Sequence, residues 1–300
     1  MSKVNYISVE EASQKWQISE RSVRNYCAQG RVEGALLEGK TWKIPSTAKK
    51  TDRKHRHSSA EDTLLAFLKR EKEAGLKGGI YHKIQIDLTY NSNHIEGSKL
   101  THDQTRYIFE TKTLGVTDKA VKVDDIVETV NHFRCIDLII EGANTKLTES
   151  FIKQLHFILK SGTTDSQKSW FKVGDYKMLE NEVGGSETTK PAEVAGAIKV
   201  LLKEYNSKSK ITFDDILDFH VRFESIHPFQ DGNGRVGRLI MFKECLKHNI
   251  VPFIITEELK MYYYRGIKNW KTERGFLRDT CFTGQDTMKT TLDYFGIKYE

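Results

Sequence analysis

The stretch Ser225-Ile-His-Pro-Phe-Gln-Asp-Gly-Asn-Gly-Arg-Val-Gly-Arg-Leu239 decides how the rest of the chain is interpreted. An apolar helical pattern ends at His227-Pro228, and a glycine-rich turn opens a second helix with an apolar inner face. The first backbone N–H groups of such a helix lack intrahelical partners and lie at the positive end of the helix dipole. Because glycine lets an anion approach the backbone closely, the stretch predicts an anion site.

Four side chains add chemistry to this predicted anion site. Arg235 and Arg238 are three positions apart on the first helical turn, so both can reach one anion. Asp231 can hold Mg²⁺ against phosphate oxygens, and His227 is expected to titrate near pH 7 as a general base. His-Pro alone is usually a turn and Gly-Asn-Gly alone is usually a loop. Their combination indicates phosphoryl or nucleotidyl transfer.

The composition excludes several other classes of protein. The 300 residues are 38% hydrophobic and 29% charged, and no apolar run approaches the roughly 20 residues of a membrane span. The first residues show no signal-peptide pattern, so we expect a cytoplasmic protein with no membrane partner. Its four cysteines have no paired spacing, which argues against a disulfide framework and a zinc site: Cys27, Cys135, Cys245 and Cys281.

The positive charge is concentrated at the start of the chain. Residues 1–60 contain 12 Lys and Arg against 6 Asp and Glu, which equals the net charge of +6 for the whole chain. Such asymmetry favours a nucleic-acid-binding module joined to a neutral body. Residues 47–62 are polar and basic and are expected to form a linker. The predicted domains are therefore residues 1–46, which would bind DNA, and residues 63–300.

Residues 1–46 have the pattern of a small winged helix-turn-helix domain. Ser8-Val-Glu-Glu11 predicts a capped helix, Ser19 starts a second helix that ends at Gly30, and residues 35–44 predict a hairpin turning at Gly39-Lys40. The segment resembles excisionase and MerR-like DNA-binding modules, with residues 6–12 as the entry helix. A small helical domain that binds another protein is the alternative. The predicted DNA contacts are Arg21, Ser22, Arg24, Asn25 and Lys40.

The body is expected to be mainly α-helical. Helices are predicted over residues 61–75, 79–95, 102–113, 123–141, 148–161, 191–206, 212–226, 233–248, 257–271 and 285–295. Residues 177–189 are rich in Gly and Glu and lack helical periodicity, so a short exposed hairpin is predicted there.

The stretch around His227 resembles the Fic-domain signature H-x-F-x-D/E-G-N-G-R-x-x-R. All specified positions match: His227, Phe229, Asp231, Gly232, Asn233, Gly234, Arg235 and Arg238. Residues 147–156, 174–177 and 183–185 resemble the helix before the flap, the G-x-F/Y-R segment and the flap itself, although Lys177 replaces the usual Arg. The resemblance covers residues 80–295. It implies a helical Fic domain with a β-hairpin flap.

The resemblance also implies a reaction, the transfer of AMP from ATP, with Mg²⁺, to a Ser, Thr or Tyr hydroxyl of a target protein or of the chain itself. His227 would deprotonate that hydroxyl and Asp231 would ligate Mg²⁺. The implied nucleotide-binding residues are Gly232, Asn233, Gly234, Arg235, Arg238, Tyr263 and Tyr264. The target would pair with the flap by strand addition, at Glu182, Val183, Gly184 and Gly185. A phosphotransferase branch carries Lys in place of Gly234, which this chain does not.

A second motif concerns control of that reaction. Ser92-Asn-His-Ile-Glu-Gly97 fits the inhibitory pattern S/T-x-x-x-E-G/N of relatives whose inhibitory helix, here near residues 80–97, precedes the Fic core. The resemblance places Glu96 in a salt bridge with Arg238, where it would block the γ-phosphate site. The alternative is a surface glutamate before a C-capping glycine.

Two other functions stay open from the sequence. Some relatives remove AMP, with the equivalent of Glu96 positioning a water, and a transcriptional regulator could use the Fic body only as a nucleotide sensor. Intact His227 and Asp231 favour an enzyme, because a pure sensor needs no base. A homodimer is compatible with the DNA module, since such modules often read paired half-sites.

Overall fold

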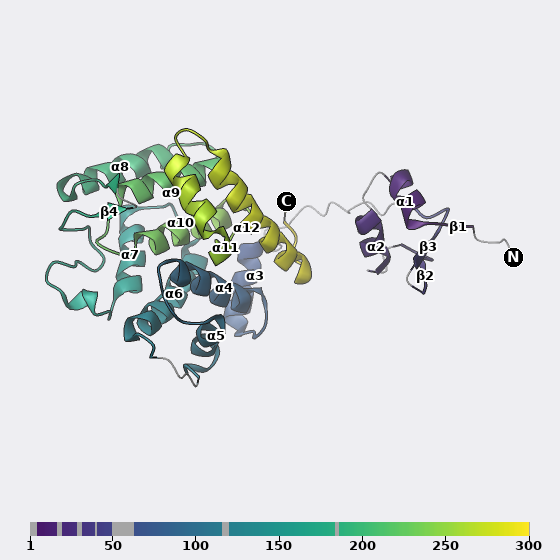
Figure 1. Ribbon diagram of the computed structural model, residues 1–300, viewed down its shortest axis with the longest axis horizontal. Helices are drawn as coiled ribbons and strands as arrows, with labels where there is room; N and C mark the ends of the chain where they lie inside the picture. The colour runs from purple at the N-terminus through teal and green to yellow at the C-terminus, as the bar shows by residue number, and fades with distance from the viewer. Residues whose placement is uncertain are drawn as a thin grey trace. The chain divides into compact units, whose positions relative to one another are not determined.

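The computed structural model describes residues 5–16, 20–28, 32–39, 41–49, 63–115, 120–183 and 186–299 (Figure 1). The chain divides into two units, residues 1–57 and 58–300, and the boundary lies within the segment predicted to be a linker. In the described part of the chain, no helix is both long and apolar enough to span a membrane. All four cysteines are buried and unpaired.

The first unit combines two helices with a three-stranded antiparallel sheet of order β1-β3-β2. Its elements are β1 (Tyr6–Ile7), α1 (Val9–Trp16), α2 (Glu20–Ala28), β2 (Leu36–Glu38) and β3 (Thr41–Pro45). The predicted capping box is present: the Glu11 N–H donates to Ser8 Oγ at 3.1 Å, and the Ser8 N–H donates to the Glu11 carboxylate at 2.7 Å. Its core is Val9, Ala12, Trp16, Val23, Cys27, Val32 and Ile44.

One expectation for the first unit was wrong. Tyr6 and Ile7, predicted as part of the entry helix, form strand β1, in which Ile7 pairs with Ile44. Ser8 explains the difference, because an N-cap residue stands before the helix and leaves its predecessors extended. The predicted hairpin is present as β2 and β3, whereas Ser19, Gly30 and the turn residue Lys40 lie outside the described residues.

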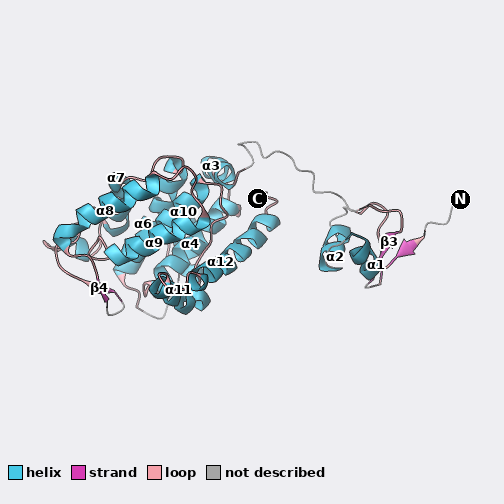
Figure 2. Cartoon of the chain, turned by 90° about the horizontal axis from the view of Figure 1, so that it is seen from above, coloured by secondary structure: helices cyan, strands magenta, loops and turns pink. Residues whose placement is uncertain are grey.

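The body is mainly helical, as predicted (Figure 2). Its helices are α3 (Leu64–Ala74), α4 (Ile80–Ile95), α5 (His102–Thr111), α6 (Val123–Gly142), α7 (Glu149–Lys160), α8 (Pro191–Asn206), α9 (Phe213–Ile226), α10 (Asn233–Lys247), α11 (Glu257–Asn269) and α12 (Gly275–Tyr294), with a 3₁₀ turn at Asp165–Gln167. The only strands described in this unit are β4 (Glu182–Val183) and β5 (Ser186–Glu187), which pair as the predicted short hairpin.

The last helix starts ten residues before its predicted start at residue 285. Gly284 lies inside α12, and a Cβ there would come within 3.0 Å of the Ile254 carbonyl oxygen. Glycine at this position therefore allows α12 to pack closely against the backbone at Ile254. The low helix propensity of glycine does not end the helix.

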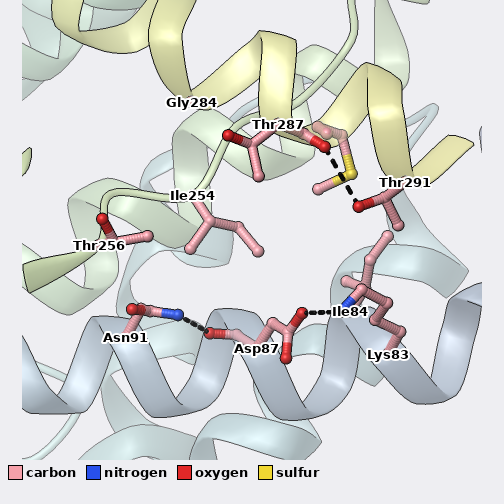
Figure 3. Close-up of a pocket in the computed structure, with 10 residues that line it drawn as sticks. Lys83, Ile84, Asp87, Asn91, Ile254, Thr256, Gly284, Thr287 and Thr291 are labelled. Atoms are coloured by element: carbon pink, nitrogen blue, oxygen red, sulfur yellow. Dashed lines mark hydrogen bonds and ion pairs between the residues drawn. The ribbon is translucent and has the colours of Figure 1, made fainter.

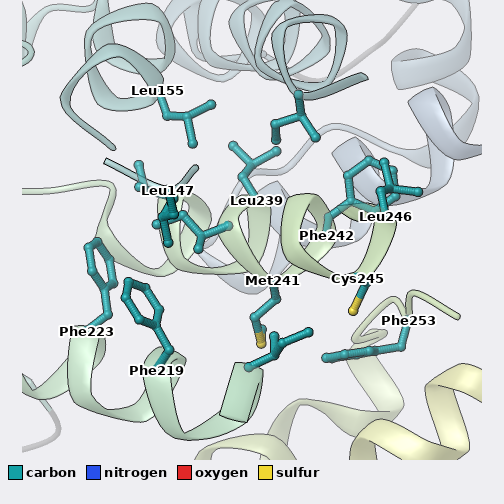
Figure 4. Packing of buried hydrophobic residues seen from close by; sticks show 14 of the residues in the cluster. Leu147, Leu155, Phe219, Phe223, Leu239, Met241, Phe242, Cys245, Leu246 and Phe253 are labelled. Atoms are coloured by element: carbon teal, nitrogen blue, oxygen red, sulfur yellow. The ribbon is translucent and has the colours of Figure 1, made fainter. Parts of the chain in front are cut away.

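Helix α10 lies at the centre of the body and packs against α3, α4, α6, α7 and α9. Thirteen of its fifteen residues are buried, so it is covered on all sides. Figure 4 shows Leu239 and Met241 of α10 among Phe219 and Phe223 of α9 and Leu155 of α7. The core therefore holds the start of α10, where the predicted anion site lies, in a fixed position.

Candidate active site

His227 ends helix α9 in a backbone conformation that side chains rarely adopt. Its φ and ψ are 51° and 62°, in the left-handed region, and its N–H donates to the Phe223 carbonyl at 2.9 Å. Non-glycine residues in this region are uncommon and cluster at functional sites. The conformation turns the chain from α9 into the loop that leads to α10.

The pKa of His227 differs from the expectation of a group titrating near pH 7. Burial and the nearby Lys177 ammonium lower this pKa to about 4. A hydrogen bond to the Glu224 backbone and the carboxylates of Asp231 and Glu96 only partly oppose this shift. The imidazole is therefore neutral at pH 7 and able to accept a proton.

The loop between α9 and α10 is held by Asn233. Its side-chain amide accepts from the Phe229 N–H and donates to the Phe229 carbonyl, both at 2.8 Å. Asn233 and Phe229 are buried, so this side chain holds the loop and is not free to bind phosphate, contrary to the expectation. Its backbone N–H still belongs to the first turn of α10, which begins after Gly232 at a φ of 83°.

Two cations and two carboxylates form a closed cluster beside that first turn. Lys160 of α7 contacts Glu128 of α6 and lies 2.6 Å from Asp231 Oδ2. Arg235 contacts the other Glu128 oxygen, and its Nη2 lies 3.2 Å from Asp231 Oδ2. Burial raises the pKa of Asp231, but the charges of Arg235 and Lys160 outweigh it and hold this pKa well below its usual range.

Arg238 is paired separately with the C-terminal end of α4. Its Nη2 lies 2.6 Å from Glu96 Oε1, and the guanidinium donates to Ser92 Oγ at 3.0 Å and to the Ser92 carbonyl at 2.9 Å. The contact that the inhibitory motif implies is therefore present, and Gly97 follows in the left-handed conformation at a φ of 97°. A Cβ on Gly234 would come within 2.3 Å of Glu96 Oε1, so this carboxylate fills the space above the glycine.

Next to Arg238 lies a group of enclosed titratable side chains, Glu224, His220 and Tyr263. Glu224 and His220 are not among the site residues that the sequence predicts. Burial raises the pKa of Glu224 to about 8 although Arg238 opposes the shift, so this carboxyl is largely protonated at pH 7. His220 hydrogen-bonds the Tyr263 hydroxyl, and both are buried. The expected tyrosine pair is therefore divided: Tyr263 is fully enclosed, whereas 41% of Tyr264 is exposed and can meet a ligand.

The predicted flap is attached by Lys177 and Asn181 to residues 227–232, the loop between α9 and α10, which contains His227 and is called the catalytic loop below. Lys177 is buried, and its Nζ donates to Asn181 Oδ1 at 2.7 Å and to Thr188 Oγ1 at 2.6 Å. The Lys177 N–H donates to the Pro228 carbonyl at 2.9 Å, and the Asn181 amide donates to the Phe229 carbonyl at 3.1 Å. Glu182 is exposed, whereas Gly184, Gly185 and the side chain of Val183 lie outside the described residues.

Asp231 is the residue that fits a magnesium ion. Its carboxylate is ionised, and half of the side chain is exposed although it contacts Lys160 and Arg235. The described residues contain no cluster of three or more His, Cys, Asp or Glu that could hold a metal. Mg²⁺ is commonly bound by one or two carboxylates together with substrate phosphates. The residues therefore fit a metal that arrives with a nucleotide.

A separate hollow of about 100 Å³ lies between α4 and α12 (Figure 3). Its polar groups are already paired: Lys83 Nζ lies 2.7 Å from Asp87 Oδ2, and the Asn91 amide donates to the Asp87 carbonyl at 2.8 Å. None of residues 225–239 lines this hollow, so it is separate from the predicted site.

The structure describes one of the five side chains that are predicted to contact DNA. Arg24 of α2 is exposed and pairs with Glu20 at 2.6 Å. The side chains of Arg21, Ser22 and Asn25 and the whole of Lys40 lie outside what the structure describes, so these contacts remain predictions.

Glu128 and Lys160 complete the site without belonging to any motif. The one signal for Glu128 is on α6, where Thr129, Asn131 and His132 are buried polar residues that interrupt an apolar face. Lys160 carries no comparable signal, because a lysine in the last turn of a helix is ordinary.

Residues 146–245 match the sequence profile of the Fic/DOC family, and this segment contains the whole stretch from Ser225 to Leu239. The chain is 28% identical over 244 residues to a protein adenylyltransferase Fic of Aedes aegypti, covering 79% of this chain and 45% of that protein. The protein of the same name from Drosophila melanogaster is 26% identical over 236 residues, covering 76% and 44%. The chain thus spans less than half the length of these curated relatives.

Solved structures of Fic proteins are similar to the body in fold. A Fic domain containing signaling protein from Bacteroides thetaiotaomicron is 27% identical, with a TM-score of 0.57 and coverage of 77% of this chain and 90% of that one. Fic-1 from C. elegans, 17% identical, has a similar fold with a TM-score of 0.61 and coverage of 77% and 72%. The body is therefore similar in fold to these Fic structures, and residues 146–245, which contain the candidate site, match the Fic/DOC family.

Proposed function

We propose that this chain is a self-inhibited protein adenylyltransferase that moves AMP from ATP to a Ser, Thr or Tyr hydroxyl of a target protein or of itself. The observation that carries the proposal is the start of α10, where unpartnered backbone N–H groups, two arginines and an ionised Asp231 surround one helix end beside a neutral His227. The similarity to proteins named adenylyltransferases supports this reaction.

Each residue would act on a defined atom of the substrates. The His227 imidazole accepts the proton of the target hydroxyl, whose oxygen attacks the α-phosphorus, and pyrophosphate leaves with the electron pair of the broken P–O bond. The first N–H groups of α10 bind the phosphate oxygens, and the positive charge of Arg235, which stays paired with Glu128 and Asp231, favours the anion beside them. Mg²⁺, held by Asp231 and the nucleotide, would neutralise phosphate charge. Exposed Tyr264 is placed to stack on the base.

The proposed self-inhibition follows from competition for Arg238. The Glu96 carboxylate occupies Arg238 and the space above Gly234, where a nucleotide phosphate would otherwise approach. Two anions cannot share this place without strong repulsion. A nucleotide can therefore bind productively only when Glu96 leaves.

We also propose that residues 1–46 bind DNA. This proposal rests on the concentration of positive charge in residues 1–60 and on two helices followed by a hairpin. A titration of the full chain with labelled duplex DNA at two salt concentrations tests it. Affinity that falls steeply with salt supports DNA binding, and no binding at low salt contradicts it.

The reaction class is tested with ATP labelled on either the α or the γ phosphate. The Glu96→Gly protein, with Mg²⁺ and a cell lysate, should transfer the α label to protein and leave the γ label in pyrophosphate. His227→Ala in the same background should lose about 100- to 10,000-fold of this transfer, because the proton acceptor is gone. Transfer of γ label alone would indicate a kinase-like reaction. ATP binding without any transfer would favour a nucleotide sensor.

A further inference from the structure

His156 joins two segments that the proposed reaction needs in one place. This residue of α7 is fully buried, and its Nδ1 accepts a hydrogen bond from the Gly174 N–H at 2.9 Å. Its Nε2 lies 3.2 Å from the Asp231 carbonyl oxygen. The ring also stacks on Phe229, with centroids 3.9 Å apart and planes 5° apart. One imidazole thus contacts both the entrance to the flap and the catalytic loop.

These two partners allow only one protonation state of the ring. A backbone N–H can only donate, so Nδ1 must be unprotonated, and a carbonyl oxygen can only accept, so Nε2 must carry the hydrogen. His156 is therefore a neutral Nε2–H tautomer. Burial and the nearby Lys160 ammonium lower the pKa of His156 to about 3, which agrees with a neutral ring.

Gly174 allows the contact on the flap side. Its φ is 77°, and a Cβ there would lie 2.9 Å from Cβ of Phe157. Three residues later, Lys177 donates its N–H to Pro228, and Asn181 donates to Phe229. The segment before the flap therefore contacts the catalytic loop directly at Lys177 and Asn181, and His156 is the link that reaches Asp231.

We propose that His156 is a positioning residue that fixes the Asp231 backbone relative to the flap. A target paired with the flap and a nucleotide held at Asp231 would then share one rigid frame. A shift of about 1 Å between reacting groups can cost roughly 100-fold in rate, so such a frame matters for catalysis. The importance of this frame for catalysis rests on the proposed function. The coupling of the two segments through the hydrogen bonds of His156 is a property of the folded chain, whatever reaction it catalyses.

The coupling is tested first without any reaction. Nitrogen-15 spectra of the full wild-type chain should show an unprotonated Nδ1 and a protonated Nε2 for His156. In His156→Phe, which keeps the stacking but loses both hydrogen bonds, amide exchange should rise at least ten-fold in residues 174–183 and 228–232 together. His156→Gln, whose amide can reach Asp231, should exchange within about three-fold of wild type at 228–232.

Leu155→Ala is the matched control, because it removes buried surface from the same helix without removing either hydrogen bond. It should raise exchange along α7 in preference to the two linked segments. An Nδ1–H tautomer, or unchanged exchange in both segments of His156→Phe, overturns the proposal. If His156→Phe does not fold, the tautomer and the Gln variant decide.

An activity measurement then separates this inference from the proposed function. In the Glu96→Gly background, His156→Phe should lower kcat by about 10- to 100-fold, while the Kd of a non-hydrolysable ATP analogue changes less than three-fold. If Glu96→Gly itself transfers no AMP, the proposed function fails and the exchange data alone judge the coupling. If kcat is unchanged in His156→Phe, the positioning role is wrong.

Discussion

The two arginines of the candidate site are neutralised in different ways. Arg235 shares Glu128 and Asp231 with Lys160, and these side chains come from α6, α7 and the catalytic loop at the centre of the body. Among the residues that the structure describes, Arg238 has one carboxylate partner within salt-bridge distance, Glu96, which lies where α4 ends. The exposed fraction of the side chain is 14% for Glu128 and 30% for Glu96. The contacts of Arg235 are therefore the more enclosed set, and the contact of Arg238 with Glu96 is the more open to solvent.

This difference supports the proposal that one helix end serves both stability and control. Two arginines in the first turn of α10 oppose the helix dipole and need anions nearby. Glu128 meets this need for Arg235, and it also neutralises buried Lys160. Ser92 gives Arg238 two further hydrogen bonds, so this guanidinium retains partners when Glu96 is displaced.

The largest expected effect comes from removing each of the two glutamates in turn and comparing the losses of stability. Glu128→Ala leaves Lys160 and Arg235 buried with only Asp231 between them, so we expect a loss of about 3 kcal/mol in the free energy of unfolding. Glu96→Ala should cost about 1 kcal/mol, because Arg238 keeps its bonds to Ser92. Urea denaturation of both variants measures the difference. Equal losses would show that the two carboxylates contribute equally to the free energy of unfolding, which contradicts the difference described above.

A smaller effect is expected from the two adjacent tyrosines. Tyr263→Phe removes the hydroxyl that pairs with His220 in the core and should cost about 1–2 kcal/mol of unfolding free energy. Tyr264→Phe should change stability by less than about 0.5 kcal/mol, since this ring is partly exposed. Tyr264→Ala should instead weaken binding of an ATP analogue several-fold. A strong stability loss at Tyr264, or weaker analogue binding with Tyr263→Phe alone, would contradict the assignment.

The smallest effect concerns pH. Protonation of His227 removes the proton acceptor, so the rate must fall as pH falls through its pKa, which is about 4 in the folded chain. Between pH 5.5 and 7.5, kcat/KM of the Glu96→Gly protein should therefore change less than about two-fold. Glu96 raises this pKa, so its removal moves the decline to still lower pH. A ten-fold decline between pH 6.5 and 5.5 would mean that His227 keeps an ordinary pKa.

Much of the fold and the centre of the site could be predicted from the sequence. The capping box at Ser8, the helix before Gly97 and the turn before α10 all follow from local rules, and each is present. Contacts between distant segments follow no local rule. Glu128 is 107 positions from Arg235, and His156 is 75 positions from Asp231, so only packing of the helices brings them together.

Two expectations about site residues change for the same physical reason. Asn233 was expected to bind phosphate, but the reversal of the chain after His227 leaves Phe229 backbone groups that need hydrogen bonds, and Asn233 supplies both. His227 was expected to titrate near pH 7, but burial and the Lys177 ammonium, which arrives from the flap, lower its pKa. In both cases the sequence identifies the residue but does not show which groups pack against it in the fold.

The most direct test of the account compares wild type and Glu96→Gly side by side. Both proteins are incubated with Mg²⁺ and α-labelled ATP, and the label incorporated into protein is measured over time. We expect at least ten-fold faster incorporation by Glu96→Gly, because Arg238 and the space above Gly234 become free for a nucleotide phosphate. Equal rates in the two proteins would contradict the claim that Glu96 restrains the reaction.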